Sequence, residues 1–167
     1  MTRTTLELQV IAAARATGYE IDLVECDPNL ADTAAFCETY GYTLNQSANT
    51  IIVASRKPQG LVAACLVLAT HRLDVNGTVR KKLGARKVSF APADVTVKVT
   101  RMLMGGVTPF GLPNEIPIWI DASVMNEPYV IVGGGSRSLK LGVPPAAIAA
   151  LEHAEVVDSL AKPATAT

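Results

Sequence analysis

The sequence predicts a single domain that mixes helices and strands. The chain has 167 residues, 49% of them hydrophobic, which is enough for one sizeable core. Segments with the spacing of an amphipathic helix alternate with segments that have the two-residue period or the β-branched composition of strands. No internal repeat and no long linker divides them. We therefore expect one α/β domain of the α+β type over residues 1–160, followed by a frayed, disordered tail over 161–167.

The first part of the chain is predicted to contain two helices and one strand. Residues 5–17 place apolar side chains at helical spacing, and a glycine follows directly. Residues 20–26 alternate polar and apolar side chains, which is the period of a half-buried strand. Asp32 can cap a second helix over 33–40, which is rich in alanine and is stopped by Gly41.

The middle of the chain is predicted to form a hairpin, a short helix and a strand. Residues 49–55 are β-branched and apolar, and a second apolar run, 61–70, begins after a turn of five residues. An antiparallel hairpin is the simplest topology for two such runs. A short helix is expected over 74–83, and a short strand over 87–90.

The last part of the chain is predicted to hold two helices and two strands. The helices are expected from about 93 to 104 and from 144 to 160, and the strands over 116–121 and 129–132. Pro117 favours an edge strand or a bulge, because proline cannot donate a ladder hydrogen bond. The glycines of 133–137 are expected to turn the chain into a further extended segment, 138–141.

The stretch 105–113 is predicted to be a shaped loop. It has three glycines and two prolines in nine residues, which excludes a regular helix or a central strand. Glycine lets another molecule approach the backbone closely, and proline keeps the path rigid. The loop therefore either presents main-chain groups to a ligand or is a stiff connector, and its composition does not decide between the two.

The charges are unevenly distributed although the net charge is zero. Residues 51–101 hold ten bases and two acids, whereas residues 1–50 hold seven acids and two bases. Clustered Lys and Arg side chains attract polyanions, so the basic middle third suggests a partner rich in phosphate. The alternative is a solvated basic face that the acidic N-terminal part balances in space.

Cysteine and histidine form no recognisable metal centre or catalytic triad. Cys26, Cys37 and Cys65 are odd in number and lack a CxxC pair, which argues against a disulfide framework and against a zinc site. We expect all three to be buried. His71 and His153 lie far apart in the sequence and outside any local motif, so we expect no metal and no cofactor.

No membrane segment or export signal is expected. The longest apolar run, 61–69, has nine residues, far fewer than the ~20 that span a bilayer. Residues 1–5 lead into an amphipathic pattern and do not resemble a signal peptide. We therefore expect the protein in the cytoplasm.

A dinucleotide site is considered at 129–135 and rejected. A strand followed by glycines is typical of the turn that cradles a pyrophosphate. That fingerprint needs a helix directly after the glycines, whereas residues 139–141 have an extended pattern.

Several short blocks occur in the order and spacing of one known family. They are Ala34-Ala35 with the break Tyr40-Gly41, the block Asn49 to Val53, Arg72 to Asp74 with Lys82 to Ala85, the GxxxPFG pattern of Gly105 to Gly111, and Tyr129 to Arg137. Over about Asp27 to Leu151 the sequence resembles the YbaK family, also called the prolyl-tRNA-synthetase-associated editing domain.

The resemblance implies a mixed, mostly antiparallel, barrel-like sheet flanked by helices. It also implies a free-standing hydrolase that removes a wrong amino acid from the 3′-terminal adenosine of misacylated tRNA by cleaving the ester. Family members work by positioning and by backbone donors, without a metal or a triad. The implied partner is aminoacylated tRNA, and an aminoacyl-tRNA synthetase is a further candidate. The oligomeric state stays open.

The resemblance also assigns site residues. Asn49 and Thr50 fall at the catalytic positions. The positions expected to surround the terminal adenosine or the aminoacyl group are Gly105, Gly106, Thr108 and Pro109 on one wall, and Gly133, Gly134, Ser136 and Arg137 on the other. For Arg137, a surface arginine in a turn is the alternative. The residues expected to contact tRNA phosphates are Arg80, Lys81, Lys82, Arg86 and Lys87.

The sequence departs from the family pattern at two places. Many active members carry lysine where this chain has Asn49, and an amide brings no charge. Residues 100–104 also differ, with Arg101 and methionines where members tend to have Thr-Gly and an aromatic residue. The chain is therefore either a deacylase with altered specificity or an inactive member that binds tRNA or a nucleotide-like ligand. An unrelated small-molecule hydrolase is the third alternative.

Overall fold

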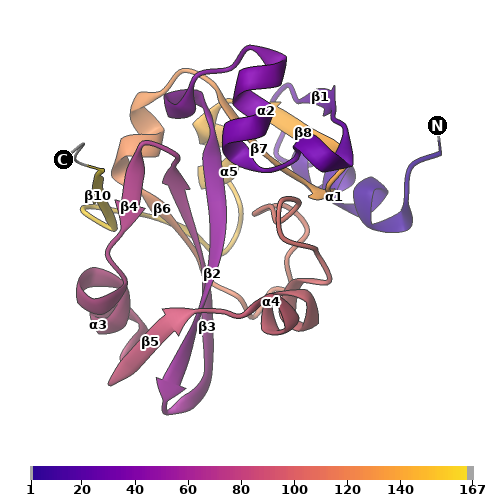
Figure 1. The fold of residues 1–167 in the computed structure, drawn as a ribbon. Helices are drawn as coiled ribbons and strands as arrows, with labels where there is room; N and C mark the ends of the chain where they lie inside the picture. Colours follow the sequence, from indigo (N-terminus) through magenta and orange to yellow (C-terminus); the bar gives the residue numbers. More distant parts are fainter. Residues whose placement is uncertain (1, 165–167) are drawn as a thin grey trace.

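The fold is built around a long β-hairpin. The structure is a computed structural model that describes residues 2–164. In it, β2 (Ala48–Lys57) and β3 (Gln59–Leu68) pair antiparallel and lie at the centre of a five-stranded sheet in the order β5-β2-β3-β6-β9 (Figure 1). The other three strands are β5 (Lys87–Phe90), β6 (Ile118–Asp121) and β9 (Ala154–Val157). β6 runs parallel to both of its neighbours.

Two smaller antiparallel sheets complete the described strands. The first has the order β1-β8-β7 and consists of β1 (Asp22–Glu25), β8 (Leu139–Val143) and β7 (Val130–Ser136). The second pairs β4 (His71–Leu73) with β10 (Ala161–Pro163).

The α/β class of the prediction is confirmed, but the barrel-like sheet is wrong. Across the described residues, an isolated bridge from Ser47 to Ile131 connects the five-stranded and three-stranded sheets. A barrel needs a continuous ladder that leaves no edge strand, whereas β5 and β9 are both edges here.

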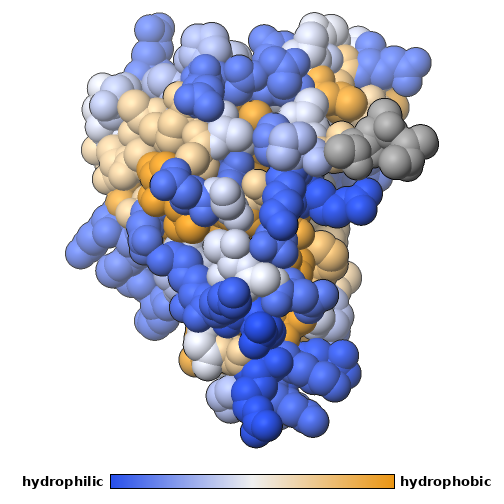
Figure 2. All heavy atoms as spheres, turned by 90° about the vertical axis from the view of Figure 1, so that its left-hand side faces the viewer, coloured by the Kyte–Doolittle hydropathy of each residue, from blue (hydrophilic) through white to orange (hydrophobic). Residues whose placement is uncertain are grey.

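Five α-helices flank the sheets within the described part of the chain. They are α1 (Thr5–Arg15), α2 (Thr33–Tyr40), α3 (Arg80–Leu83), α4 (Ala93–Thr100) and α5 (Pro145–Ala149). In Figure 1, α3 and α4 lie on opposite sides of the β2–β3 hairpin. Figure 2 views the side that carries α3, where hydrophilic side chains gather over the lower part of the molecule.

Two apolar cores lie on the two faces of the central sheet. Alternate residues of β3 point to opposite faces, so Ala64, Leu66 and Leu68 join the larger core, and Cys65 and Val67 join the smaller one. The larger core also includes side chains of α1, β7 and β8, and α4 packs against it. Because both faces of β3 are buried, its sequence is a continuous apolar run.

Local signals placed several elements correctly. The helix over 33–40 and the strand over 87–90 have the predicted bounds, and Gly41 ends α2 in the left-handed conformation, with φ 81°. The predicted helix over 74–83 is confirmed in part, because a π-helical turn over Val75–Val79 precedes α3.

The predicted closing helix over 144–160 is wrong. α5 ends at Ala149, and Ala154–Val157 forms β9 beside β6. The tail expected from residue 161 likewise begins as β10, which pairs with β4, while residues 165–167 lie outside the described residues. The ladders and the burial of Leu160 outweigh the helical propensity of the alanines.

The structure corrects three further predictions. The helix predicted to reach residue 104 ends at Thr100, because Arg101 adopts a left-handed φ of 65°. Pro117 lies before β6, which is an interior strand. The glycines of 133–135 continue β7 instead of forming a turn.

Candidate functional site

A pocket of about 260 Å³ lies where four segments distant in the sequence meet. Its walls come from the start of β2, the residues before and at the start of α2, the loop after α4, and the strands β7 and β8. The predicted site residues Asn49, Thr50, Gly105 and Gly133 all line it. The structure therefore brings the two predicted catalytic positions and the glycine-rich loop to one cavity.

The β2 wall contributes Asn49 and Thr50 to the lining of the pocket. The hydroxyl of Thr33 donates to Oδ1 of Asn49 at 2.8 Å, which orients the amide. The hydroxyl oxygen of Thr50 is buried and has no hydrogen-bond partner among residues 2–164. Buried polar groups in proteins are nearly always paired, so an orphan that lines a cavity indicates a place for a ligand atom or a water.

The opposite wall is main chain packed on main chain. The N–H of Gly135 donates to the carbonyl of Gly106 at 2.8 Å. A Cβ atom at Gly106 would lie 2.6 Å from backbone atoms of Ser136, and one at Gly133 would lie 2.2 Å from the carbonyl oxygen of Val107. No side chain fits at either contact, so these two glycines set how closely the loop approaches β7.

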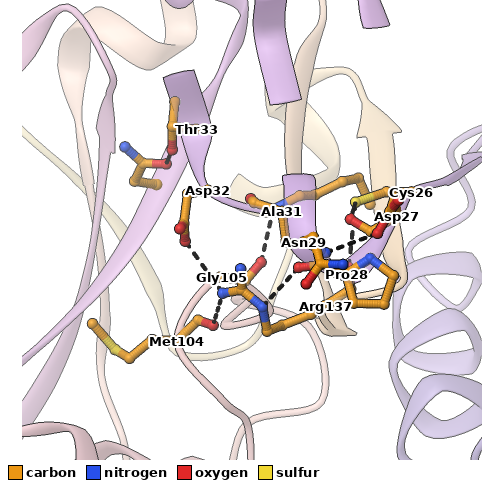
Figure 3. A network of polar contacts seen from close by, with 12 residues as sticks. Cys26, Asp27, Pro28, Asn29, Ala31, Asp32, Thr33, Met104, Gly105 and Arg137 are labelled. Carbon is orange, nitrogen blue, oxygen red and sulfur yellow. Dashed lines mark hydrogen bonds and ion pairs between the residues drawn. The ribbon is translucent and has the colours of Figure 1, made fainter. Parts of the chain in front are cut away.

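Arg137 fastens this loop to the segment that starts α2 (Figure 3). Its Nε donates to the carbonyl of Pro28 at 3.0 Å, and its Nη1 donates to the carbonyl of Met104 at 2.8 Å. Nη1 also pairs with the carboxylate of Asp32 at 3.2 Å. Asp32 accordingly makes no side-chain capping bond to its own helix. Arg137 thus contacts the protein itself and orders the rim of the pocket.

Lys140 is a pocket residue that the sequence analysis missed. It lies on β8, the middle strand of its sheet, and is 8% exposed. Its ammonium group donates to the carbonyls of Gly105 at 2.7 Å and of Ala31 at 2.8 Å. Burial lowers the pKa of Lys140 below that of an ordinary lysine. The available signal was a charge inside a strand, 139–143, whose other residues are apolar or glycine.

Besides Gly106 and Arg137, four predicted binding residues do not line the pocket. Thr108 is fully buried, and Pro109 borders a separate cavity near the C-terminal end of α1. Gly134 packs against Leu139, and the hydroxyl of Ser136 donates to Glu7 at 3.0 Å. Their predicted contact with the substrate stays a prediction, and in the structure they support the loop and β7.

Comparison with known proteins identifies the family. Residues 27–151 match the aminoacyl-tRNA editing domain. The chain belongs to this family. The match covers the walls of the pocket from Ala31 to Lys140.

Two solved structures share the fold of this editing domain. A candidate trans-editing enzyme for prolyl tRNA synthetase is 21% identical, with a TM-score of 0.80, over 98% of this chain and 100% of its own. A hypothetical protein is 25% identical, also with a TM-score of 0.80, over 90% of this chain and 97% of its own.

A second, larger hollow in the editing domain is basic. It has a volume of about 1000 Å³ and lies between the β2–β3 hairpin, β5 and α4. Its charged lining residues are Arg56, Lys57, Lys87 and Lys98, with no acid among the described lining residues. We call it the basic groove. It shares β2 with the pocket, which uses residues 48–51, whereas the groove uses 54–57.

The residues predicted to contact tRNA are only partly in the basic groove. Lys87 lines it. Lys82 instead pairs with Glu155 at 2.7 Å and lies over the ring of Trp119, and Nε of Arg80 donates to a backbone carbonyl. Arg80, Lys81 and Lys82 belong to α3, which lies on the side of the hairpin that Figure 2 views.

None of the helices within 2–164 is both long enough and apolar enough to cross a membrane. The same part of the chain contains no group of three or more His, Cys, Asp or Glu side chains that could hold a metal ion.

The unpaired hydroxyl of Thr50 gives a testable prediction. Thr50→Val removes a buried hydroxyl without a partner, so we expect the free energy of unfolding to stay the same or rise by about 1 kcal/mol. Thr100→Val is the matched control, since that buried hydroxyl donates to the carbonyl of Thr96 at 2.7 Å. The control should lose about 1–2 kcal/mol. Urea denaturation measures both, and a clear loss for Thr50→Val would mean that its hydroxyl is already satisfied.

Proposed function

We propose that the protein is a trans-acting aminoacyl-tRNA deacylase, which cleaves the ester between a wrong amino acid and the 3′-terminal adenosine of tRNA. Membership in the editing-domain family supports this proposal. The observation that carries it is the shared pocket, whose lining includes Asn49, Thr50 and Gly105. A synthetase that mischarges tRNA would supply the substrate, and we expect the reaction in the cytoplasm.

The pocket has what ester hydrolysis needs from a protein without a metal or a triad. A water must be held against the carbonyl carbon, and donors must meet the oxygen that becomes negative. The hydroxyl of Thr50 is free to bond such a water or the ester, and the amide of Asn49 has its oxygen already engaged by Thr33, which leaves its N–H groups for the ligand.

The size of the pocket favours a small amino acid. A volume of about 260 Å³ is below the ~300–1000 Å³ that is usual for pockets holding drug-sized ligands. The apolar lining residues Ile51, Met104 and Val107 would contact the amino-acid side chain. We therefore propose that alanine, serine or cysteine esters fit better than larger ones.

A panel of mischarged tRNAs tests the proposed activity. Incubation with Ala-, Ser- and Cys-tRNA should accelerate ester loss over buffer for at least one of them. Asn49→Ala and Thr50→Val should lower kcat by on the order of 10²-fold, the usual cost of losing a donor in an acyl-transfer site. Asn45→Ala is the control, because Asn45 is exposed and bonds Glu127 outside the pocket. If no tRNA is deacylated faster than in buffer, the alternative of a binding-only family member gains support.

The basic groove is our proposed site for the tRNA backbone. Both hollows border β2, the pocket at residues 48–51 and the groove at residues 54–57, and α4 runs from the groove to the loop that forms the pocket wall. Its four cations would meet acceptor-stem phosphates while the 3′ end enters the pocket. Arg80, Lys81, Lys82 and Arg86 would extend this contact around the hairpin to the α3 side.

Charge reversal tests the proposed RNA contact. The double variant Lys57→Glu and Lys98→Glu should weaken tRNA binding and reduce the slope of log affinity against log salt by about 2, one for each lost phosphate contact. Arg80→Glu with Lys81→Glu reports on the α3 side, and Lys162→Glu, on the exposed part of β10, is the control. Filter binding at several salt concentrations measures the slopes. An unchanged slope for both double variants would remove the proposed interface.

A further inference from the structure

We propose that Lys140 is a catalytic residue of the pocket, whose ammonium group donates its third N–H to an electron-rich oxygen of the ligand. In the reaction proposed above, on which this inference rests, that oxygen is the carbonyl oxygen of the aminoacyl ester. Lys140 would also bind a simple carboxylate at the same place.

One of the three N–H donors of Lys140 is left for a ligand. An ammonium group has three N–H donors. Two of them reach the carbonyls of Ala31 and Gly105, and Lys140 itself lines the pocket. The third donor has no protein acceptor among the described residues. A ligand oxygen in the pocket would complete the set.

The charge of Lys140 is not neutralised by an acid. Lys140 takes part in none of the ion pairs formed within residues 2–164. Its Nζ lies 5.5 Å from the centre of the Phe36 ring, a weak compensation for burial. Burying a cation that only two neutral carbonyls and an aromatic face contact costs free energy. An anionic or partly negative ligand would offset that cost.

The neighbours of Lys140 in the pocket suit the same ligand. Thr50 offers an unsatisfied hydroxyl, and Asn49 offers amide N–H groups. Asp32 at the rim is the one acid among the described lining residues, and it pairs with Arg137. Hydrogen-bond donors and one cation therefore dominate the polar groups of the pocket. Such groups would stabilise a ligand oxygen that gains negative charge.

The chemical step balances with Lys140 keeping its proton. A water oxygen attacks the ester carbonyl carbon and loses a proton to solvent, and the π electrons of the C=O bond move to the oxygen that Lys140 contacts. When the C=O bond re-forms, the bond to the ribose oxygen breaks and that oxygen takes up a proton. The products are the free amino acid and deacylated tRNA. The cation, itself only 8% exposed, stabilises the intermediate electrostatically.

A purely structural role for Lys140 is the competing explanation. Its two hydrogen bonds join the residue before Asp32 to Gly105, and so help to close the pocket. A clamp needs only donors, so a glutamine would preserve part of it. A role in charge stabilisation needs the cation, so this role should be lost in both Lys140→Gln and Lys140→Met.

Kinetics on the full-length protein give the first test. With the tRNA ester that the wild type cleaves best, Lys140→Gln and Lys140→Met should both lower kcat by on the order of 10²-fold, with little change in KM. Lys162→Met is the control, and thermal unfolding of every variant checks the fold. Wild-type kcat in the folded Lys140→Gln protein would overturn the proposal and leave the deacylase proposal intact.

An anion titration gives a second test that does not depend on activity. Sodium acetate, compared with sodium chloride at equal ionic strength, should shift the NMR signals of the Lys140 ammonium and the Thr50 amide saturably in the wild type. The Thr50 shift should disappear in Lys140→Gln. If the wild type shows these shifts but cleaves no tRNA ester, the anion site stands and the deacylase proposal fails. If acetate moves neither signal in the wild type, the proposal is overturned even if both variants unfold.

Discussion

The candidate site depends on the close contact between two stretches of main chain. Gly106 and Gly133 let the loop after α4 lie directly on β7, where a Cβ at either position would overlap backbone atoms. That contact fixes the position of Gly105, whose carbonyl accepts from Lys140, and so determines the distance between the loop and β2. A wider separation would remove Lys140 and Gly105 from the cavity that Asn49 and Thr50 share.

Polar side chains secure the same loop from its other side. Arg137 donates to the carbonyl of Met104 and pairs with the carboxylate of Asp32 (Figure 3). Lys140 donates to the carbonyls of Gly105 and Ala31. Both cations come from the β7–β8 hairpin, so one short unit of chain holds the loop and the start of α2 together. The pocket thus combines a rigid frame with a hydroxyl that has no partner within residues 2–164, as expected of a site arranged for a ligand.

Local patterns predicted the parts of this fold that local forces determine. Gly41 ends α2 as expected and Asp32 stands at its N-cap position, although its carboxylate pairs with Arg137 and does not cap the helix. The glycine-rich loop borders a pocket, as its composition allowed. β9 was missed because its pairing with β6 is a contact between distant segments that no local pattern encodes. Lys140 was missed for a similar reason, since only the burial of β8 on both faces turns an ordinary lysine into a pocket cation.

The most direct test is a crystal structure of the protein with 3′-deoxy-3′-(alanylamino)adenosine, an amide analogue of the aminoacyl end of tRNA that cannot be cleaved as an ester. The predicted result places the alanyl carbonyl in the pocket, within hydrogen-bonding distance of Lys140 or Thr50, with Gly105 against the ligand. An analogue bound in the basic groove, or one whose alanyl group points to solvent while the pocket stays closed to it, would contradict the proposed site.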